Sequence, residues 1–207
     1  DLFYKIGDFY YENGRKYGFK DAKKIALTYY KKAAQKGNID APYKIGDLYN
    51  YGFSDKDKNM KETLKWYKKA ADAGNKTAMH TLGEYYVQDK TRGKLLYSYG
   101  EKDLQKGLEY FEKACKAGNI KSMLILGFYY EYGDAGFVKD EKKSLEYYKK
   151  ALETEPSNED ALYAMGRFYE HGKGGLPQDE NKAMEYYEKA VTNEKKSPKY
   201  AFIKLLS

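Results

Sequence analysis

The chain has 207 residues, of which 25 are tyrosine and 38 are lysine or arginine, and its formal net charge is +7. No apolar run reaches the roughly 18 residues of a membrane-spanning helix, and no basic-then-apolar signal segment opens the sequence. A tyrosine ring can pack while its hydroxyl stays in water, so this composition favours many thin amphipathic helices over one thick apolar core.

A glycine motif recurs five times along the chain and marks an internal repeat. At residues 45–49, for example, the sequence reads Ile-Gly-Asp-Leu-Tyr. The motif glycines are separated by 39, 37, 44 and 39 residues, and they are Gly7, Gly46, Gly83, Gly127 and Gly166. An aromatic pair followed by charged residues and alanine, such as residues 66–70, begins 20 to 27 residues after each glycine. Repeats of this length are typical of solenoid proteins.

Each repeat is predicted to contain two helices. In the second repeat, Ala41, Ile45 and Leu48 share one helical face, and Leu64 and Tyr67 share a face of the next helix. In chain order, the first helices are expected within residues 1–13, 40–52, 77–89, 121–133 and 160–172. The second helices should begin after side-chain N-caps, which are Asp21, Asn59, Asp103, Asp140 and Asp179.

The motif glycines need a structural reason because they lie inside predicted helices. Glycine in a helix interior costs about 1 kcal/mol relative to alanine. Five glycines at the same position of the repeat therefore indicate that another helix approaches closely there. The alanines near the ends of the second helices, which are paired in the first two repeats, suggest the same for the stacking of neighbouring repeats.

The combined pattern resembles the Sel1-like repeat, a relative of the tetratricopeptide repeat, over essentially the whole chain. The resemblance implies an all-α fold in which antiparallel helix pairs stack into a right-handed superhelical solenoid with a concave and a convex wall. It also implies one continuous domain over residues 1–207. The expected repeats are 1–39, 40–76, 77–120, 121–159 and 160–199, followed by a capping helix at 200–207.

Catalytic signatures are missing from the sequence. It contains two histidines, one cysteine, and none of the common serine-nucleophile or metal-binding motifs. We therefore expect no enzyme activity, no cofactor and no metal site. Some cysteine-rich members of the family have been proposed to bind or cleave β-lactams, so a β-lactam or cell-wall ligand is kept as an alternative.

The positive charge is unevenly distributed between the two kinds of helix. The five first-helix windows together carry a net charge of −6, so the rest of the chain carries +13. Because first helices line the concave wall in the resembled family, the resemblance implies a basic convex exterior. Nucleic-acid binding through these lysines is therefore a third and less favoured reading.

The resemblance also places particular residues in the concave groove. They lie three before, one after, and four or five after each motif glycine. The expected partner-binding residues are Tyr4, Asp8, Tyr11, Tyr43, Asp47, Asn50, His80, Glu84, Phe128, Glu131, Tyr163, Arg167 and Glu170. Aromatic rings among carboxylates suit a protein or peptide partner that carries lysine or arginine. Alternatively, the tyrosines only complete the packing of each repeat and the carboxylates are a solvated face.

The third repeat is longer than the others between its helices. About seven extra residues fall within residues 89–103, and this stretch contains Leu95, Leu96, Tyr97 and Tyr99. Exposed apolar residues on a loop can contact a partner, so the insertion is either a second contact or a neutral loop.

Overall fold

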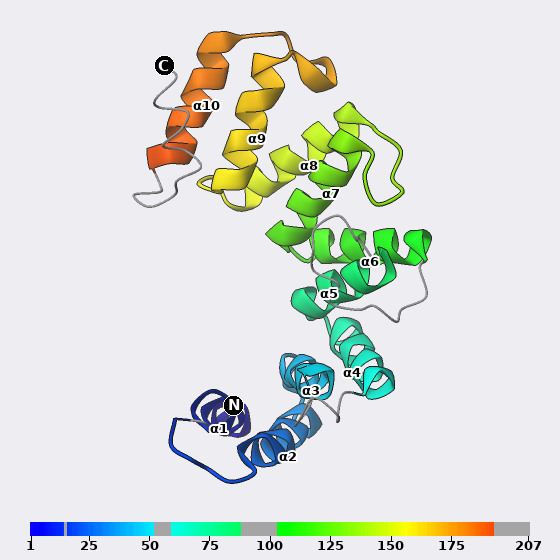
Figure 1. Ribbon diagram of the computed structural model, residues 1–207, viewed down its shortest axis with the longest axis vertical. Coiled ribbons are helices and arrows are strands. Elements are labelled where there is room, and N and C mark those ends of the chain that lie inside the picture. The colour runs from blue at the N-terminus through cyan, green and yellow to red at the C-terminus, as the bar shows by residue number, and fades with distance from the viewer. Residues whose placement is uncertain (15, 52–58, 88–102, 193–207) are drawn as a thin grey trace. The chain divides into compact units, whose positions relative to one another are not determined.

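The computed structural model of the chain describes residues 1–14, 16–51, 59–87 and 103–192. In these ranges it contains ten α-helices, one short 3-10 helix and no strand (Figure 1). The all-α class predicted from the sequence is therefore confirmed. No helix within the described ranges is long and apolar enough to cross a membrane.

The helices form five consecutive pairs, one for each repeat. The first helices are α1 (Leu2–Asn13), α3 (Ala41–Tyr51), α5 (Lys76–Val87), α7 (Ile120–Tyr132) and α9 (Glu159–Glu170). The second helices are α2 (Ala22–Gln35), α4 (Met60–Asp72), α6 (Leu104–Lys116), α8 (Glu141–Thr154) and α10 (Glu180–Thr192). The 3-10 helix η1 (Lys173–Gly175) lies between α9 and α10. Every first helix packs against the second helix of its own repeat.

The described helices fall into two compact units. The first unit contains α1 to α6, in which α2 also packs against α3 and α4 against α5. The second unit contains α7 to α10, in which α8 packs against α9. One continuous domain over residues 1–207 stays a prediction. The expected cap at 200–207 and residues 89–102 of the predicted insertion lie outside the described residues.

An asparagine lies at each connection between repeats, and a glycine precedes it in the first three connections. Gly74 has a φ of +94°, a left-handed conformation that favours glycine, and the next residue caps α5. Oδ1 of Asn75 accepts a 2.7 Å hydrogen bond from the backbone N–H of Ala78. The same asparagine cap begins α3, α7 and α9, at Asn38, Asn119 and Asn158.

Four of the five predicted caps of the second helices are confirmed. Side chains accept hydrogen bonds from backbone N–H groups at the start of α4, α6, α8 and α10, and they are Asn59, Asp103, Asp140 and Asp179. Asp21 stands at the predicted N-cap position of α2, but the expected side-chain bond is absent, because this residue has a φ of +58° and its side chain makes no capping hydrogen bond. Its carboxylate instead lies 3.0 Å from Nζ of Lys24.

The motif glycines make room for an aromatic ring from the paired helix. A Cβ atom added at Gly46 would lie 2.5 Å from Cδ1 of Tyr67, closer than real Cβ atoms come. The relation is the same in the other repeats, where the glycine and ring are Gly7 and Tyr30, Gly83 and Phe111, Gly127 and Tyr148, and Gly166 and Tyr187. The predicted close approach is thus a contact within one repeat, between a first helix and the second aromatic residue of the pair.

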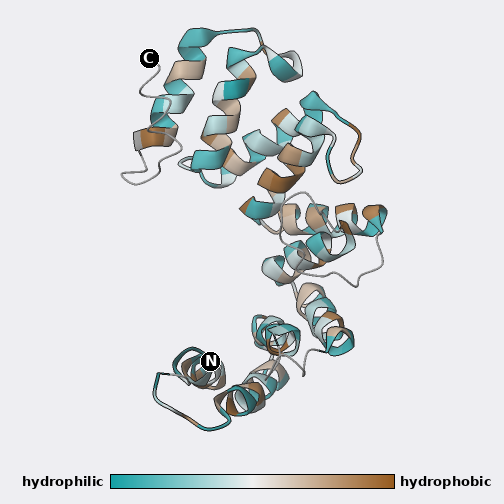
Figure 2. Ribbon diagram, in the orientation of Figure 1, coloured by the Kyte–Doolittle hydropathy of each residue, from teal (hydrophilic) through white to brown (hydrophobic). Residues whose placement is uncertain are grey.

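Apolar side chains form separate core clusters, each built by neighbouring helices of one unit. Figure 2 shows hydrophobic and hydrophilic residues mixed along the same helices. Ala41 and Leu48 are 0% and 1% exposed, because they face the preceding α2. The same repeat positions in α1 hold Leu2 and Phe9, which are 71% and 46% exposed. Burial at these positions therefore depends on a preceding second helix.

Candidate functional site

Carboxylates of the first unit that were predicted to line the groove are held by tyrosines of the second helices. The hydroxyl of Tyr30 donates a 2.7 Å hydrogen bond to Oδ1 of Asp8, and Tyr67 does the same to Asp47 at 2.7 Å. Both aspartates directly follow a motif glycine. The ring that the glycine accommodates therefore also orients the neighbouring carboxylate.

In the first unit, the ring three residues before each motif glycine packs on the same second-helix ring. Tyr4 lies 5.7 Å from Tyr30, and Tyr43 lies 5.3 Å from Tyr67, measured between ring centroids. In the third repeat His80 takes this place, 5.6 Å from Phe111. The packing role suggested for these rings is therefore real, while Tyr4 and Tyr43 remain half-buried rather than covered.

One lysine of the first unit shows how this face holds a cation. Nζ of Lys44 lies 5.6 Å from the ring centroid of Tyr11 and 3.7 Å from Oδ1 of Asp8. Its neighbours come from α1, whereas the lysine itself is on α3. An ammonium group is thus placed beside an aromatic face and a carboxylate, which is cation–π and ionic recognition together.

Burial and neighbouring carboxylates shift several pKa values on this face. Burial raises the pKa of Asp47 to about 6, against the opposing effects of the Tyr67 hydrogen bond and of Lys44. Burial, followed by the negative charges of nearby carboxylates, raises the pKa of Tyr4 and of Tyr43 to about 12. The pKa of Tyr51 is raised by burial and by Asp47. The neighbouring carboxylates therefore add to the effect of burial on these tyrosine hydroxyls.

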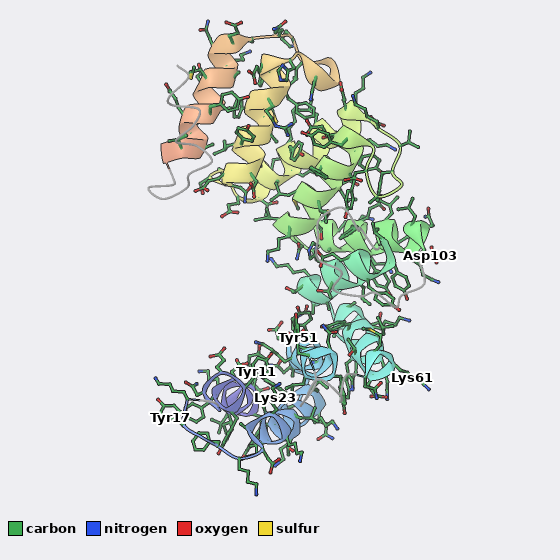
Figure 3. All side chains as sticks on the ribbon, viewed as in Figure 1. Tyr11, Tyr17, Lys23, Tyr51, Lys61 and Asp103 are labelled. Carbon is green, nitrogen blue, oxygen red and sulfur yellow. The ribbon has the colours of Figure 1, made fainter. Side chains whose placement is uncertain are left out.

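The remaining predicted residues of the first unit differ in exposure. Asn50 and His80 are each only 8% exposed, so they belong to the packed interior. Glu84 stays partly exposed, and its Oε1 lies 3.6 Å from Nε2 of His80. Tyr11 and Tyr51 lie on α1 and at the end of α3 (Figure 3). The side chain of Tyr51 is 53% exposed.

In the second unit, two predicted groove residues bind each other. Oε1 and Oε2 of Glu131 accept hydrogen bonds of 2.6 and 2.8 Å from the two Nη atoms of Arg167. Glu131 also accepts from Nζ of Lys173 at 3.1 Å and from the Tyr148 hydroxyl at 3.2 Å. Because the Glu131 side chain has no exposed surface, a partner cannot reach it in this arrangement.

The other predicted residues of the second unit also have internal contacts. Phe128 lies 4.8 Å from Tyr132, and Tyr163 lies 5.4 Å from Tyr187, between ring centroids. The Tyr187 hydroxyl donates a 2.5 Å hydrogen bond to Oε2 of Glu170. This repeats the tyrosine–carboxylate bond of the first unit, but with the acid four residues after the glycine instead of one.

A family model described as the Sel1 repeat matches five segments that together cover most of the chain. They are residues 4–38, 39–75, 92–119, 120–153 and 159–193.

The chain belongs to the Sel1 repeat family.

Sel1 repeat proteins are generally non-enzymatic scaffolds for protein interaction. A search of curated protein sequences found no match.

Solved structures agree with this assignment. A Sel1 repeat protein from Oxalobacter formigenes is 26% identical, with a TM-score of 0.72 over 94% of this chain and 73% of that one. A protective antigen present in uropathogenic Escherichia coli strains is 25% identical, with a TM-score of 0.67. The match covers 92% of this chain but only 38% of the E. coli protein. A putative Sel1 repeat protein from Klebsiella pneumoniae, 19% identical with a TM-score of 0.51, shares the fold.

Within these Sel1 repeats, the sequence did not reveal the tyrosines that hold the carboxylates. Those residues are the second members of the aromatic pairs, Tyr30, Tyr67, Tyr148 and Tyr187. The available signal was that this position is a tyrosine in every repeat except the third, where Phe111 has no hydroxyl. Nothing in the sequence indicated the role of Lys44, because this residue lies outside the positions implied by the family resemblance.

The first members of the aromatic pairs form a different pattern in the Sel1 repeats. Tyr147 stacks on Tyr130 with centroids 5.9 Å apart, and lysines cover both rings. Nζ of Lys150 lies 5.1 Å from the Tyr147 centroid, and Nζ of Lys143 lies 5.1 Å from the Tyr130 centroid. Each remaining repeat likewise has a lysine over the first ring of its pair, at Lys32, Lys69, Lys113 and Lys189. Many lysines of the second helices are therefore positioned by the protein's own rings.

The described Sel1 repeats contain no metal cluster, and a hollow on their surface is lined mostly by lysines of α4. Across the described ranges, no group of three or more histidine, cysteine, aspartate or glutamate side chains could hold a metal ion. A surface hollow of about 540 Å³ lies along α4, where Figure 3 labels Lys61. Its described lining also comes from α4 and is mostly lysine, which gives it no convergent catalytic groups.

Proposed function

We propose that the first unit binds a basic segment of a partner protein, without catalysis, on the face formed by α1, α3 and α5. This acidic-aromatic face is defined by Tyr4, Asp8, Tyr11, Tyr43, Asp47, Tyr51 and Glu84. The observation that carries the proposal is the placement of Lys44 between Asp8 and the Tyr11 ring. The protein thereby holds one of its own cations in the way that it would hold a partner's.

The spacing of the carboxylates supports an elongated partner. Asp8, Asp47 and Glu84 occupy the same position, one residue after the motif glycine, on three consecutive first helices. Tyr30 and Tyr67 fix the directions of the first two carboxylates through hydrogen bonds. A segment with several lysine or arginine residues would meet one acid per repeat. Charge-assisted hydrogen bonds from such residues are stronger than neutral ones.

The second unit offers less of this chemistry. Its Glu131 is buried against Arg167. The position after the glycine is Phe128 in the fourth repeat and Arg167 in the fifth, so it holds no carboxylate in either. We therefore assign the binding of basic residues to the first unit.

The proposal can be tested by selecting random peptides of about 12 residues, displayed on phage, against the whole 207-residue chain. Peptides rich in lysine or arginine should be enriched on the wild-type protein. The enrichment should disappear on the Asp47→Lys, Glu84→Lys double variant, and it should persist on a Lys65→Glu, Lys69→Glu control variant. Selected peptides that lack basic residues, or that bind the two variants equally, would contradict the proposal.

A further inference from the structure

Arg167 shows which surroundings the first helices provide for a guanidinium group. Its two Nη atoms donate to both carboxylate oxygens of Glu131, at 2.6 and 2.8 Å. Its guanidinium carbon lies 5.7 Å from the ring centroid of Tyr132 and 5.6 Å from that of Tyr163. The Tyr132 hydroxyl also accepts a hydrogen bond from Nη1. At the α7–α9 junction, an arginine is therefore bound by a carboxylate and two aromatic rings.

The repeat allows this arrangement to be compared position by position with the α3–α5 junction. Tyr132 is five residues after Gly127, and Tyr51 is five residues after Gly46. The two tyrosines have similar exposure, 51% and 53%. Tyr163, three residues before its glycine, corresponds to His80, which is also a ring that packs on a second-helix aromatic residue. The aromatic surroundings are thus present at both junctions.

The charges at the two junctions differ. The position that supplies the arginine in α9 supplies Glu84 in α5, and the position of Phe128 in α7 holds Asp47 in α3. Both carboxylates act on the same tyrosines, since Asp47 and Glu84 each contribute to raising the pKa of Tyr51 and of Tyr43. The α3–α5 junction therefore combines carboxylates with aromatic rings. At the corresponding place, the α7–α9 junction is occupied by Arg167.

We propose that the α3–α5 junction binds the guanidinium group of an arginine from the partner, between the Tyr51 ring and the carboxylates of Asp47 and Glu84. This inference rests on the proposed function and names the residue that the partner contributes. A guanidinium is planar, stacks on aromatic rings and donates in several directions at once. An ammonium group is a compact point charge and suits the single carboxylate and ring that hold Lys44. Arginine should therefore bind this junction better than lysine.

The test is an NMR titration of the whole chain, labelled with ¹³C on its tyrosine rings, with two synthetic peptides. Both peptides alternate glycine with a basic residue, arginine in one and lysine in the other. The arginine peptide should shift the Tyr51 ring signals and bind about tenfold or more tightly than the lysine peptide. The Glu84→Gln variant should lose about tenfold in affinity for the arginine peptide.

A second variant introduces a glutamate–arginine pair into the α3–α5 junction, at the positions that Glu131 and Arg167 occupy in the second unit. In Asn50→Glu, Glu84→Arg, the protein's own side chain should occupy the junction as Arg167 does, and binding of the arginine peptide at Tyr51 should be lost. The Glu170→Gln variant is the matched control in the other unit and should bind like wild type. Tryptophan fluorescence of Trp66 verifies that each variant of the first unit is folded.

The outcomes separate the inference from the function on which it rests. Equal binding of the arginine and lysine peptides, with loss of both on Asp47→Lys, Glu84→Lys, would overturn the arginine assignment and leave the proposed function standing. Shifts at other tyrosines without any at Tyr51 would overturn the location. Failure of both peptides to bind, together with peptide selections that lack basic residues, would overturn both proposals.

Discussion

The hydroxyl of Tyr67 reaches across its repeat to Oδ1 of Asp47 with a 2.7 Å hydrogen bond. The same tyrosine ring lies directly over Gly46, the residue before the aspartate. One side chain therefore joins the two helices of the repeat and directs a carboxylate on the acidic-aromatic face. Packing and proposed binding are coupled through this contact, so a substitution at the glycine should affect both.

Replacing Gly46 with alanine should destabilise the protein by about 1–3 kcal/mol, although alanine favours helices. The added Cβ would lie 2.5 Å from the Tyr67 ring, which must move and lose its geometry toward Asp47. Urea unfolding followed by Trp66 fluorescence measures the effect. In a Tyr67→Leu background the same glycine substitution should cost clearly less. An equal cost in both backgrounds would show that the ring is not the reason for the glycine.

The ionisation of Asp47 should make stability depend on pH in the acid range. Because burial raises the pKa of Asp47 to about 6, above its ordinary value of 3.8, the folded state holds the proton more tightly than the unfolded state. Proton binding by Asp47 therefore stabilises the folded state near pH 4, and this stabilisation is lost as the pH rises to about 6. The free energy of unfolding of wild type relative to Asp47→Asn should fall by at most about 3 kcal/mol between these values. A difference that is flat or rises with pH would refute the assignment.

Equivalent positions in the first and second repeats should respond differently to the same substitution. Leu48→Lys should cost about 3 kcal/mol or more, because Leu48 is 1% exposed and a lysine there would bury a charge. Phe9→Lys should cost less than about 1 kcal/mol, because Phe9 is 46% exposed. Thermal and urea unfolding of the two variants provide the comparison. Equal destabilisation would mean that α1 is covered in solution.

Removing Arg167 should leave a buried negative charge in the second unit. Arg167→Met is expected to cost about 3–5 kcal/mol, since Glu131 has no exposed surface and would keep only Lys173 and Tyr148 as hydrogen-bond donors among its present contacts. Adding Glu131→Gln should recover much of the loss. Circular dichroism during urea unfolding measures both variants. Additive losses in the double variant would argue against the pair as the source of stability.

The repeat, its two helices and most of their ends could be predicted from the sequence, because local signals determine them. Gly46 and its equivalents marked the first helices, and Asn59, Asp103, Asp140 and Asp179 marked the starts of the second helices. Asp21 is at the start of α2 as predicted, but its backbone is left-handed and its side chain does not make the expected capping hydrogen bond. Such a conformation is not visible in residue type alone.

The candidate site was predictable as a set of positions, but not as a set of partners. The sequence placed Glu131 and Arg167 at separate groove positions, 36 residues apart. Only their approach at the α7–α9 junction shows that they neutralise each other. The hydrogen bond from Tyr67 to Asp47 could not be predicted for the same reason. From the sequence alone, a tyrosine in the aromatic pair is equally consistent with a purely packing role. Contacts between helices decided which predicted acids are already bound within the repeat.

The binding of basic residues by the acidic-aromatic face is tested most directly by calorimetry with a peptide selected on the wild-type chain. The dissociation constant should rise about 100-fold or more for the Asp47→Lys, Glu84→Lys variant, because two attractive charges become repulsive. It should change by less than about threefold for Lys65→Glu, Lys69→Glu, which alters α4 instead. An unchanged dissociation constant in the first variant, with its fold intact, would show that the acidic-aromatic face does not bind the basic residues.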